Sequence, residues 1–334
     1  MKYSLKKTIK TLEDIARNVL GLNFYPIEFQ WVPHEVLMSV SSGPFPIRFH
    51  HWTYGRDYYA LSLHNRLGLS HLYESFFYGN PSYAFVKDSE SLTDQILVIA
   101  HCMGHGDFST NNALFKHGDK DLVKIAIRHA ERVSRMETLY GEKEVEETLD
   151  LLFGLYFLVD TNKPLLRAPY PEPQKVLVQE PRGEFDDLLL EKNEKRERWK
   201  EINKEAPPYE EYDLLWFLYE YAPVPEWKKE LIKIFREEMY YTIPIIKTKV
   251  MNEGWASFIE WLLLREADQR YNLFDEKEFV NLLKTHTMIT SVIPSTFLSP
   301  YALGFTLWKK LYEENSEDLT KLLEIRNSYE DIGF

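Results

Sequence analysis

Cysteine is almost absent from this chain of 334 residues, which contains only Cys102. A single cysteine excludes an intrachain disulfide framework and is typical of a reducing compartment, so we expect a cytoplasmic protein. Long apolar runs are also absent. The longest, in QILVIA, is far too short to span a bilayer, and the N-terminal segment lacks the apolar stretch of a signal peptide. We therefore expect no membrane span.

Positive charge is scarce relative to negative charge. Lys and Arg number 40 against 52 Asp and Glu, which gives a net charge of −12. A nucleic-acid-binding surface needs a basic stripe, so we expect no nucleic-acid partner. No GxxxxGK[ST], GxGxxG, GxSxG or CxxC motif is present, which argues against nucleotide-transfer and α/β-hydrolase chemistry.

Helical periodicity dominates the rest of the pattern and predicts an α+β, predominantly helical fold with a short mixed or antiparallel sheet. Ser91 is expected to cap a helix that begins near Leu92 and ends around Gly104 and Gly106. Pro244 is expected to kink or break a later helix. Helices are further predicted over residues 1–20 and 119–160, a strand in SYAFVKD, and short strands with ordered loop in the aromatic-rich stretch after Gly21.

Proline and charge divide the chain into three parts. Residues 161–208 contain seven prolines and the run EKNEKRERWKE, which is typical of a linker or surface excursion. We therefore predict an N-terminal half over 1–160, the excursion over 161–208, and a helical half over 209–334. The two halves are expected to form one compact domain.

Two histidines one helical turn apart, His101 and His105, are the most informative pair in the chain. Side chains at i and i+4 project from the same helix face, so an HxxxH helix can supply two corners of a tetrahedral zinc shell. A third ligand commonly comes from a later helix, and Glu253 in MNEGWAS is the candidate. An HxxxH helix followed by a glutamate on a later helix is the ligand order of the zinc peptidases called gluzincins. It predicts a zincin-like core that binds one zinc or another divalent ion.

One residue of the peptidase pattern is missing, because the HExxH motif carries its general base where this chain has Cys102. Proton transfer would then fall to a residue outside the motif, and Glu238, Glu237 and His51 are the candidates. His51 is also the candidate for a fourth metal ligand. Glu237 and Glu238 could equally form surface ion pairs. Cys102 itself is interpreted as a small buried hydrophobe, with a thiol nucleophile as the alternative.

Two further residues are candidates for the surroundings of the metal. Asp107 could hold the free nitrogen of a ligand histidine, as carboxylates beside metal sites do, or cap the loop before Asn111. Arg48 suits a substrate carboxylate or phosphate, or a packed structural role.

Several peptides resemble, in order, the signature blocks of the SpoVR family (stage V sporulation protein R-like), over most of residues 20–308. They are NFYPIEFQWVPHEVL, PIRFHHWTYG, YAFVKD, AHCMGHGDFSTNN, REEMYYTIPIIKTKVMNEGWAS and SPYALGF. In the family the histidine block reads close to AHxxxHxDFFKNN. Asp107 and Asn112 match it beside the two histidines, and Phe108, Ser109 and Thr110 replace the FFK triplet. The resemblance makes Asn112 a further candidate near the metal.

The same resemblance implies a cytosolic protein named for spore-cortex formation, with a serine protein kinase and a von Willebrand-type protein as partners. It also implies a chain shorter than typical bacterial members, without much of their C-terminal portion. Two functions stay open. The first is a metal-dependent hydrolase of peptide or amide bonds. The second is a non-catalytic regulator or scaffold whose metal site is structural and which acts with the kinase.

Overall fold

The computed structural model describes residues 4–43, 49–66, 74–170, 175–179, 199–203, 210–291 and 298–334. Within these ranges the chain is mostly helical with a small mixed three-stranded sheet, which confirms the predicted α+β, mainly helical class. In chain order the elements are α1 (Leu5–Asn18), β1 (Ile27–Val32), α2 (His34–Ser41), α3 (Trp52–Arg66), β2 (Glu74–Phe77), β3 (Ser82–Lys87), α4 (Leu92–Asn111), the short 3₁₀ helix η1 (Ala113–Phe115), α5 (Leu122–Tyr140), α6 (Glu142–Gly154), β4 (Lys175–Gln179), β5 (Trp199–Asn203), α8 (Leu214–Tyr221), α9 (Glu226–Lys247), α10 (Lys249–Tyr271), α11 (Glu276–Thr290), α12 (Pro300–Glu314) and α13 (Leu319–Ser328).

The three-stranded sheet has the order β1-β3-β2, with β3 parallel to β1 and antiparallel to β2. Alternate residues of β3 are buried, and Ala84 and Val86 pack against Val98 and Cys102 of α4. β1 and β3 lie where strands were predicted. The helix α2 was not expected in the stretch predicted as strands and loop, and the four-residue strand β2 was not foreseen.

The helix α4 begins as predicted, because the Ser91 hydroxyl accepts a hydrogen bond from the backbone N–H of Asp94 at 3.2 Å. The prediction that it ends around Gly104 and Gly106 is wrong, since the helix continues to Asn111. Glycine inside a helix costs about 1 kcal/mol relative to alanine, so these two glycines need another reason. A Cβ on Gly104 would lie 2.6 Å from the Cα atom of Ala256 on α10, so glycine permits the two helices to approach closely.

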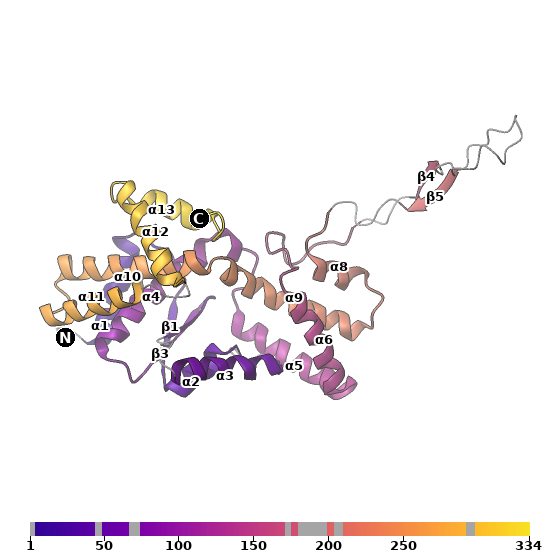
Figure 1. Ribbon diagram of the computed structural model, residues 1–334, viewed down its shortest axis with the longest axis horizontal. Helices are drawn as coiled ribbons and strands as arrows, with labels where there is room; N and C mark the ends of the chain where they lie inside the picture. The colour runs from indigo at the N-terminus through magenta and orange to yellow at the C-terminus, as the bar shows by residue number, and fades with distance from the viewer. Residues whose placement is uncertain are drawn as a thin grey trace, which may run out of the picture.

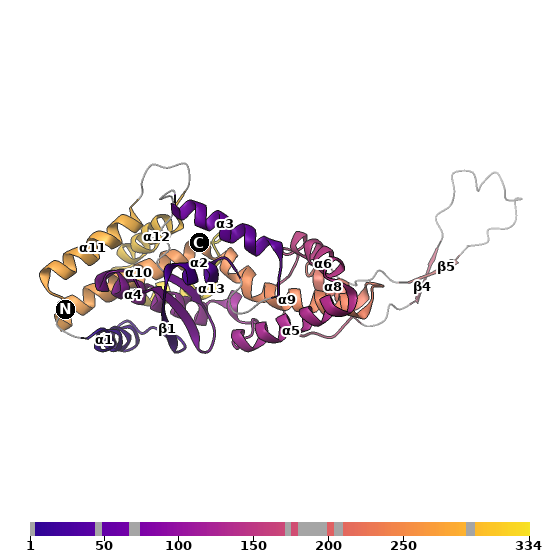
Figure 2. The same cartoon turned by 90° about the horizontal axis from the view of Figure 1, so that it is seen from below.

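The helix α10 is the centre of the larger core. It packs against α4, α12 and α1, and a Cβ on Gly254 would collide with the backbone of Gly304 on α12. Two buried tryptophans fill the space between these helices: Trp255 of α10 and Trp308 of α12, whose rings meet edge to face at 4.8 Å. Figures 1 and 2 show α10 lying among α4, α11 and α12.

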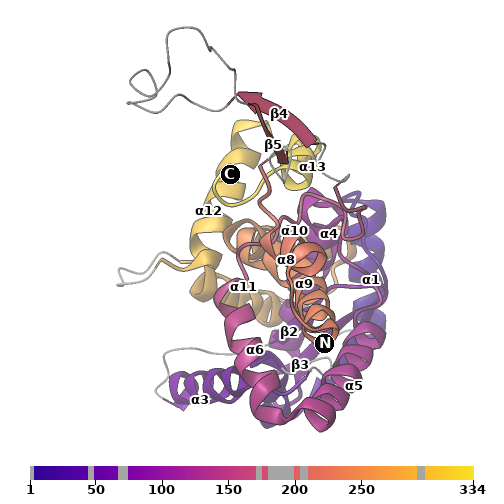
Figure 3. The ribbon, with the colours of Figure 1, turned by 90° about the vertical axis from the view of Figure 1, so that its right-hand side faces the viewer.

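A second apolar core joins α5, α6, α8 and α9 and includes Val133, Leu149, Leu215 and Phe235. Figure 3 shows these helices from the end of the molecule at which they gather. The long helix predicted over 119–160 is divided into α5 and α6 by Gly141, whose φ of 96° lies outside the helical region.

The junction between α9 and α10 is a single buried residue, Thr248. Pro244, which was expected to kink or break the helix, does not end it, because α9 continues to Lys247. At this position in the last turn the missing N–H removes one hydrogen bond near the end of the ladder. The Asp331 carboxylate accepts the N–H groups of Val250 and Met251, both at 2.8 Å, and so caps the start of α10.

Only parts of the predicted excursion over 161–208 are among the described residues. β4 and β5 pair antiparallel, with Lys175 opposite Asn203. In Figures 1 and 2 this ribbon projects away from the helices. The domain boundaries drawn from the sequence stay predictions. Among the described residues, no helix is both long and apolar enough to cross a membrane.

Candidate metal centre

His101 and His105 project side by side from α4. Their rings meet edge to face with centroids 4.7 Å apart, and the residues are only 4% and 7% exposed. Phe76 of β2 stacks on His105 at 5.6 Å. The pair therefore lies between the sheet and α10, in the tightly packed part of the molecule.

Glu253 reaches the pair from the second turn of α10. Its Oε2 atom lies 3.5 Å from Nε2 of His101 and 3.4 Å from Nε2 of His105. Ligand atoms at about 2.0–2.1 Å from a tetrahedral zinc ion are separated by roughly 3.3–3.4 Å. Nε2 of His101 and Oε2 of Glu253 are buried and have no hydrogen-bond partner among the described residues. Such orphaned atoms need an explanation, and the donor set and its spacing fit a divalent cation.

The opposite nitrogens of both imidazoles are held by side chains of α10. Glu260 accepts a hydrogen bond from Nδ1 of His101 at 3.0 Å, and Oδ1 of Asn252 accepts one from Nδ1 of His105 at 2.9 Å. A proton on Nδ1 leaves the lone pair on Nε2, which is the atom that faces Glu253. The two α10 side chains thus select the tautomers that a metal requires.

Glu74, the first residue of β2, supplies a second carboxylate. One of its oxygens and a ring nitrogen from each histidine lie within 4.8 Å of one another. Burial raises the pKa of Glu74, a positive charge on His101 opposes the rise, and the charge of Glu253 adds to it. This carboxyl group is therefore poised to hold a proton more readily than an exposed glutamate does.

Negative charge dominates the centre. Burial alone would lower the pKa of His101, but the carboxylates of Glu253 and Glu260 outweigh burial and raise it to about 10. Burial would raise the pKa of Glu253, yet the histidines and an ion pair with Lys249 keep it well below its usual range. The charge of Glu253 and burial raise the pKa of Tyr301, so this phenol stays a neutral donor beside the site. Without a metal ion His101 therefore carries a proton on both ring nitrogens at neutral pH, and a cation that binds Nε2 would displace one of these protons.

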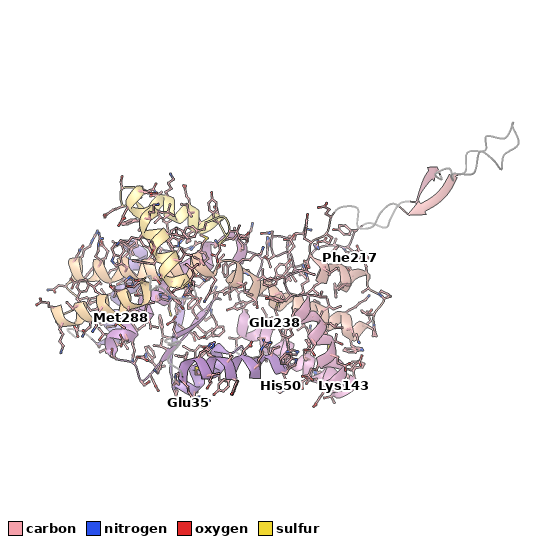
Figure 4. All side chains as sticks on the ribbon, viewed as in Figure 1. Glu35, His50, Lys143, Phe217, Glu238 and Met288 are labelled. Carbon is pink, nitrogen blue, oxygen red and sulfur yellow. The ribbon has the colours of Figure 1, made fainter. Side chains whose placement is uncertain are left out.

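The residues proposed for proton transfer lie elsewhere. Glu237 and Glu238 of α9 bind the two ring nitrogens of His129 on α5, at 2.8 and 2.9 Å. Figure 4 shows Glu238 on α9 in the half of the molecule that carries α5 and α6. Glu238 lies nine residues before the end of its helix, about 13 Å along the axis. The structure therefore does not bring these carboxylates to the histidine pair.

His51 is held in another cluster. Its Nδ1 lies 2.8 Å from the Thr53 hydroxyl, its Nε2 lies 3.2 Å from Asp150, and its ring stacks on Phe153 at 4.3 Å. Burial lowers its pKa. These partners belong to the start of α3 and to α6, so the predicted role of His51 as an acid or fourth ligand lacks the required geometry.

Asp107 does not hold a ligand histidine. Its carboxylate accepts hydrogen bonds from the indole of Trp255 and the N–H of Asn23, both at 2.9 Å, and forms an ion pair with Arg326. Asn112 donates to the carbonyl oxygens of Arg326 and Tyr329. Both residues tie α4 to neighbouring elements. Arg48 lies outside the described residues.

Sequence reasoning missed Glu74, Asn252, Glu260 and His286 as partners of the site. Glu260 is seven residues after Glu253, so it lies on the same face of α10, and that spacing could have identified it. Asn252 stands directly beside Glu253. Glu74 and His286 come from β2 and α11, and no local pattern connects them with the HxxxH motif.

Cys102 is fully buried against the sheet, and burial raises the pKa of its thiol well above the usual range. A reactive cysteine needs an exposed, stabilised thiolate. The structural interpretation of Cys102 therefore agrees with its surroundings.

Comparison with known proteins places the chain in a family. A family model described as "SpoVR like protein" matches residues 2–332. The uncharacterized protein YcgB of Escherichia coli (strain K12) is 30% identical over 324 residues, which cover 89% of this chain. The chain spans 61% of the length of that relative. No solved structure matches. With its family model matched over nearly its whole length, the chain is a member of the SpoVR family.

Proposed function

We propose that the chain binds one divalent metal ion, zinc by preference of its donors, through His101, His105 and Glu253, and that this site serves the hydrolysis of a peptide or amide bond. Imidazole nitrogen and carboxylate oxygen are the donors of catalytic zinc sites. One observation supports the proposal above all others: Oε2 of Glu253 lies 3.4–3.5 Å from both Nε2 atoms, and it has no hydrogen-bond partner among the described residues.

When bound, the ion would supply Lewis acidity, which polarises a carbonyl group and lowers the pKa of water. Glu74 would supply the base that HExxH peptidases place where this chain has Cys102. Its carboxylate would accept a proton as water adds to the carbonyl carbon, and would return that proton to the nitrogen as the C–N bond breaks.

The proposal includes a zincin-like arrangement of the core. An HxxxH helix packed on a mixed sheet, and a later helix that carries the third ligand, support it. A cytosolic location, expected from the single cysteine, is part of the same proposal.

Metal analysis of the purified protein is the first test. We expect about one zinc per chain, with loss of binding in His105→Ala and Glu253→Gln. Glu237→Gln, the same chemical change on α9, is the matched control and should bind as the wild type does. A wild-type protein that holds no stoichiometric metal after reconstitution with zinc would refute the site.

The Glu74→Gln variant shows whether Glu74 acts as a general base or as a metal ligand. If Glu74 transfers protons, the variant keeps its metal affinity and loses activity on a peptide and amide panel. If Glu74 is a fourth ligand, metal affinity falls as well, and the site has the closed shell of a structural centre.

The burial of the centre favours a second function, a regulator or scaffold stabilised by its metal. His101, His105 and Glu253 are each less than 8% exposed, and Glu74 offers a fourth donor. In that case His101→Ala would unfold the protein, while no hydrolysis would be detected for the wild type. The serine protein kinase and the von Willebrand-type protein implied by the family are then the partners to test, by co-purification with the intact chain.

A further inference from the structure

A buried chain of three side chains leads away from the candidate metal centre. Glu260 of α10 is 2% exposed and accepts two imidazole hydrogen bonds. Its Oε2 lies 3.0 Å from Nδ1 of His101, and its Oε1 lies 2.6 Å from Nδ1 of His286. His286 stands on α11, which packs against both α4 and α10. Figures 1 and 2 show α11 alongside these helices.

The far nitrogen of His286 indicates that this residue is not there for packing alone. The residue is 4% exposed, and its Nε2 is buried without a hydrogen-bond partner among the described residues. Its ring packs edge to face on Phe305 at 4.9 Å. A buried polar atom without a partner costs free energy, and a leucine in this apolar position would carry no such cost. Among the residues that the structure describes, Glu260 is the one hydrogen-bond partner of the ring, through Nδ1.

We propose that His286 is a positioning residue for the metal centre. By donating its Nδ1–H to Oε1, it fixes the plane of the Glu260 carboxylate, so that Oε2 stays directed at Nδ1 of His101. The inference rests on the proposed metal site, since the orientation of His101 matters only if its Nε2 binds an ion.

The physical reason is the torsional freedom of a glutamate. A carboxylate held through one oxygen can rotate about its terminal bond, which is a soft, broad torsion. Hydrogen bonds to both oxygens, from His101 on α4 and His286 on α11, remove that freedom. Because Glu260 in turn selects the Nδ1–H tautomer of His101, the constraint reaches the ligand nitrogen.

Zinc affinity of position-286 variants tests the proposal, measured by competition with a chromophoric chelator. Asparagine places an amide donor near the position of Nδ1, glutamine places it near that of Nε2, and leucine has none. We expect His286→Asn to stay within about threefold of the wild type, and His286→Gln and His286→Leu to weaken binding by about 10- to 100-fold. The absorption spectrum of bound Co²⁺ should change in the same two variants.

Leu282→Ala is the control for a merely structural effect. Leu282 is buried one turn earlier on α11 and belongs to the main core, so its truncation loosens the helix but removes no hydrogen bond to Glu260. Affinity should not change in that variant. Equal affinities of the Asn and Gln variants would overturn the role of His286, even if the leucine variant fails to fold. A wild type that binds no zinc would instead refute the metal site itself.

Discussion

The Cα atom of Ala256 lies 2.6 Å from the position that a Cβ on Gly104 would occupy. This crossing brings α4 and α10 close together, between the two histidines of one helix and near Glu253 of the other. The spacing of the candidate ligands therefore depends on the absence of a single methyl group.

Gly104→Ala should destabilise the protein by about 1–3 kcal/mol or more, because the added carbon overpacks a backbone contact that cannot yield easily. Gly55→Ala is the control, since among the described residues no atom other than the backbone of its own helix lies within 4 Å of its Cβ position on α3. There alanine should be neutral or stabilise by up to about 1 kcal/mol. Denaturant unfolding of both variants measures the difference, and equal effects would contradict the close approach.

Asp107→Asn should cost about 3–5 kcal/mol, because it leaves the buried guanidinium of Arg326 without its counter-charge. Glu147→Gln removes one partner of the exposed pair between Lys143 and Glu147 and should cost less than about 1 kcal/mol. Thermal unfolding of the two variants provides the comparison. A small effect at Asp107 would show that this ion pair is not what holds α13 to α4.

The His129 cluster predicts that its contribution to stability falls as the pH rises above the unfolded pKa of about 6.5. Burial lowers the pKa of His129, but the carboxylates of Glu237 and Glu238 outweigh burial and raise it. The stabilisation is complete below the unfolded pKa of about 6.5 and is lost as the pH rises through the raised folded value. The free energy of unfolding of the wild type minus that of His129→Gln should therefore shrink with rising pH. A difference that does not change with pH would contradict the assignment.

Glu211 is expected to stabilise the folded state at neutral pH and to lose this effect in acid. Burial would raise its pKa, but hydrogen bonds from Arg167, Tyr170 and the N–H of Asp213, with help from Lys163, lower it to about 2. The stabilisation is present above the unfolded pKa, about 4.3, and is lost as the pH falls towards 2. The advantage of the wild type over Glu211→Gln should be largest at neutral pH and disappear in acid, as followed by denaturant titrations.

Zinc should raise the melting temperature, and a chelator should reverse the change. At a free concentration of 100 times Kd, one bound ion stabilises the folded state by about 2.7 kcal/mol. Glu253→Gln should lose this response, while Glu237→Gln keeps it. A response that persists in Glu253→Gln would locate the ion elsewhere.

The parts of the structure that follow from local rules could be predicted from the sequence. The Ser91 cap, the strand Ser82–Lys87 and the helical pairing of His101 with His105 all rest on short-range spacing. The glycines of α4 misled the prediction, because Gly104 approaches Ala256, 152 residues away in the chain, and Gly106 faces the side chains of Phe24 and Ile27. Local patterns carry no information about such contacts.

At the candidate site, too, residues in a sequence motif could be predicted, and residues brought in by tertiary packing could not. Glu253 was selected for its motif, and the structure places it at the two imidazoles. Glu74 and His286 reach the centre through the order of the sheet and the packing of α11, which no spacing rule encodes. Glu237 and Glu238 were chosen for their chemistry alone, and the fold uses them to hold His129.

The single residue between α9 and α10 also has a mechanical consequence. Thr248 connects α9, whose buried residues belong to one apolar core, with α10, whose buried residues belong to the other. Lys249 and Glu253 lie in the first two turns of α10, directly after this residue. A displacement of one core relative to the other would therefore load the backbone at Thr248, five residues before the candidate ligand Glu253.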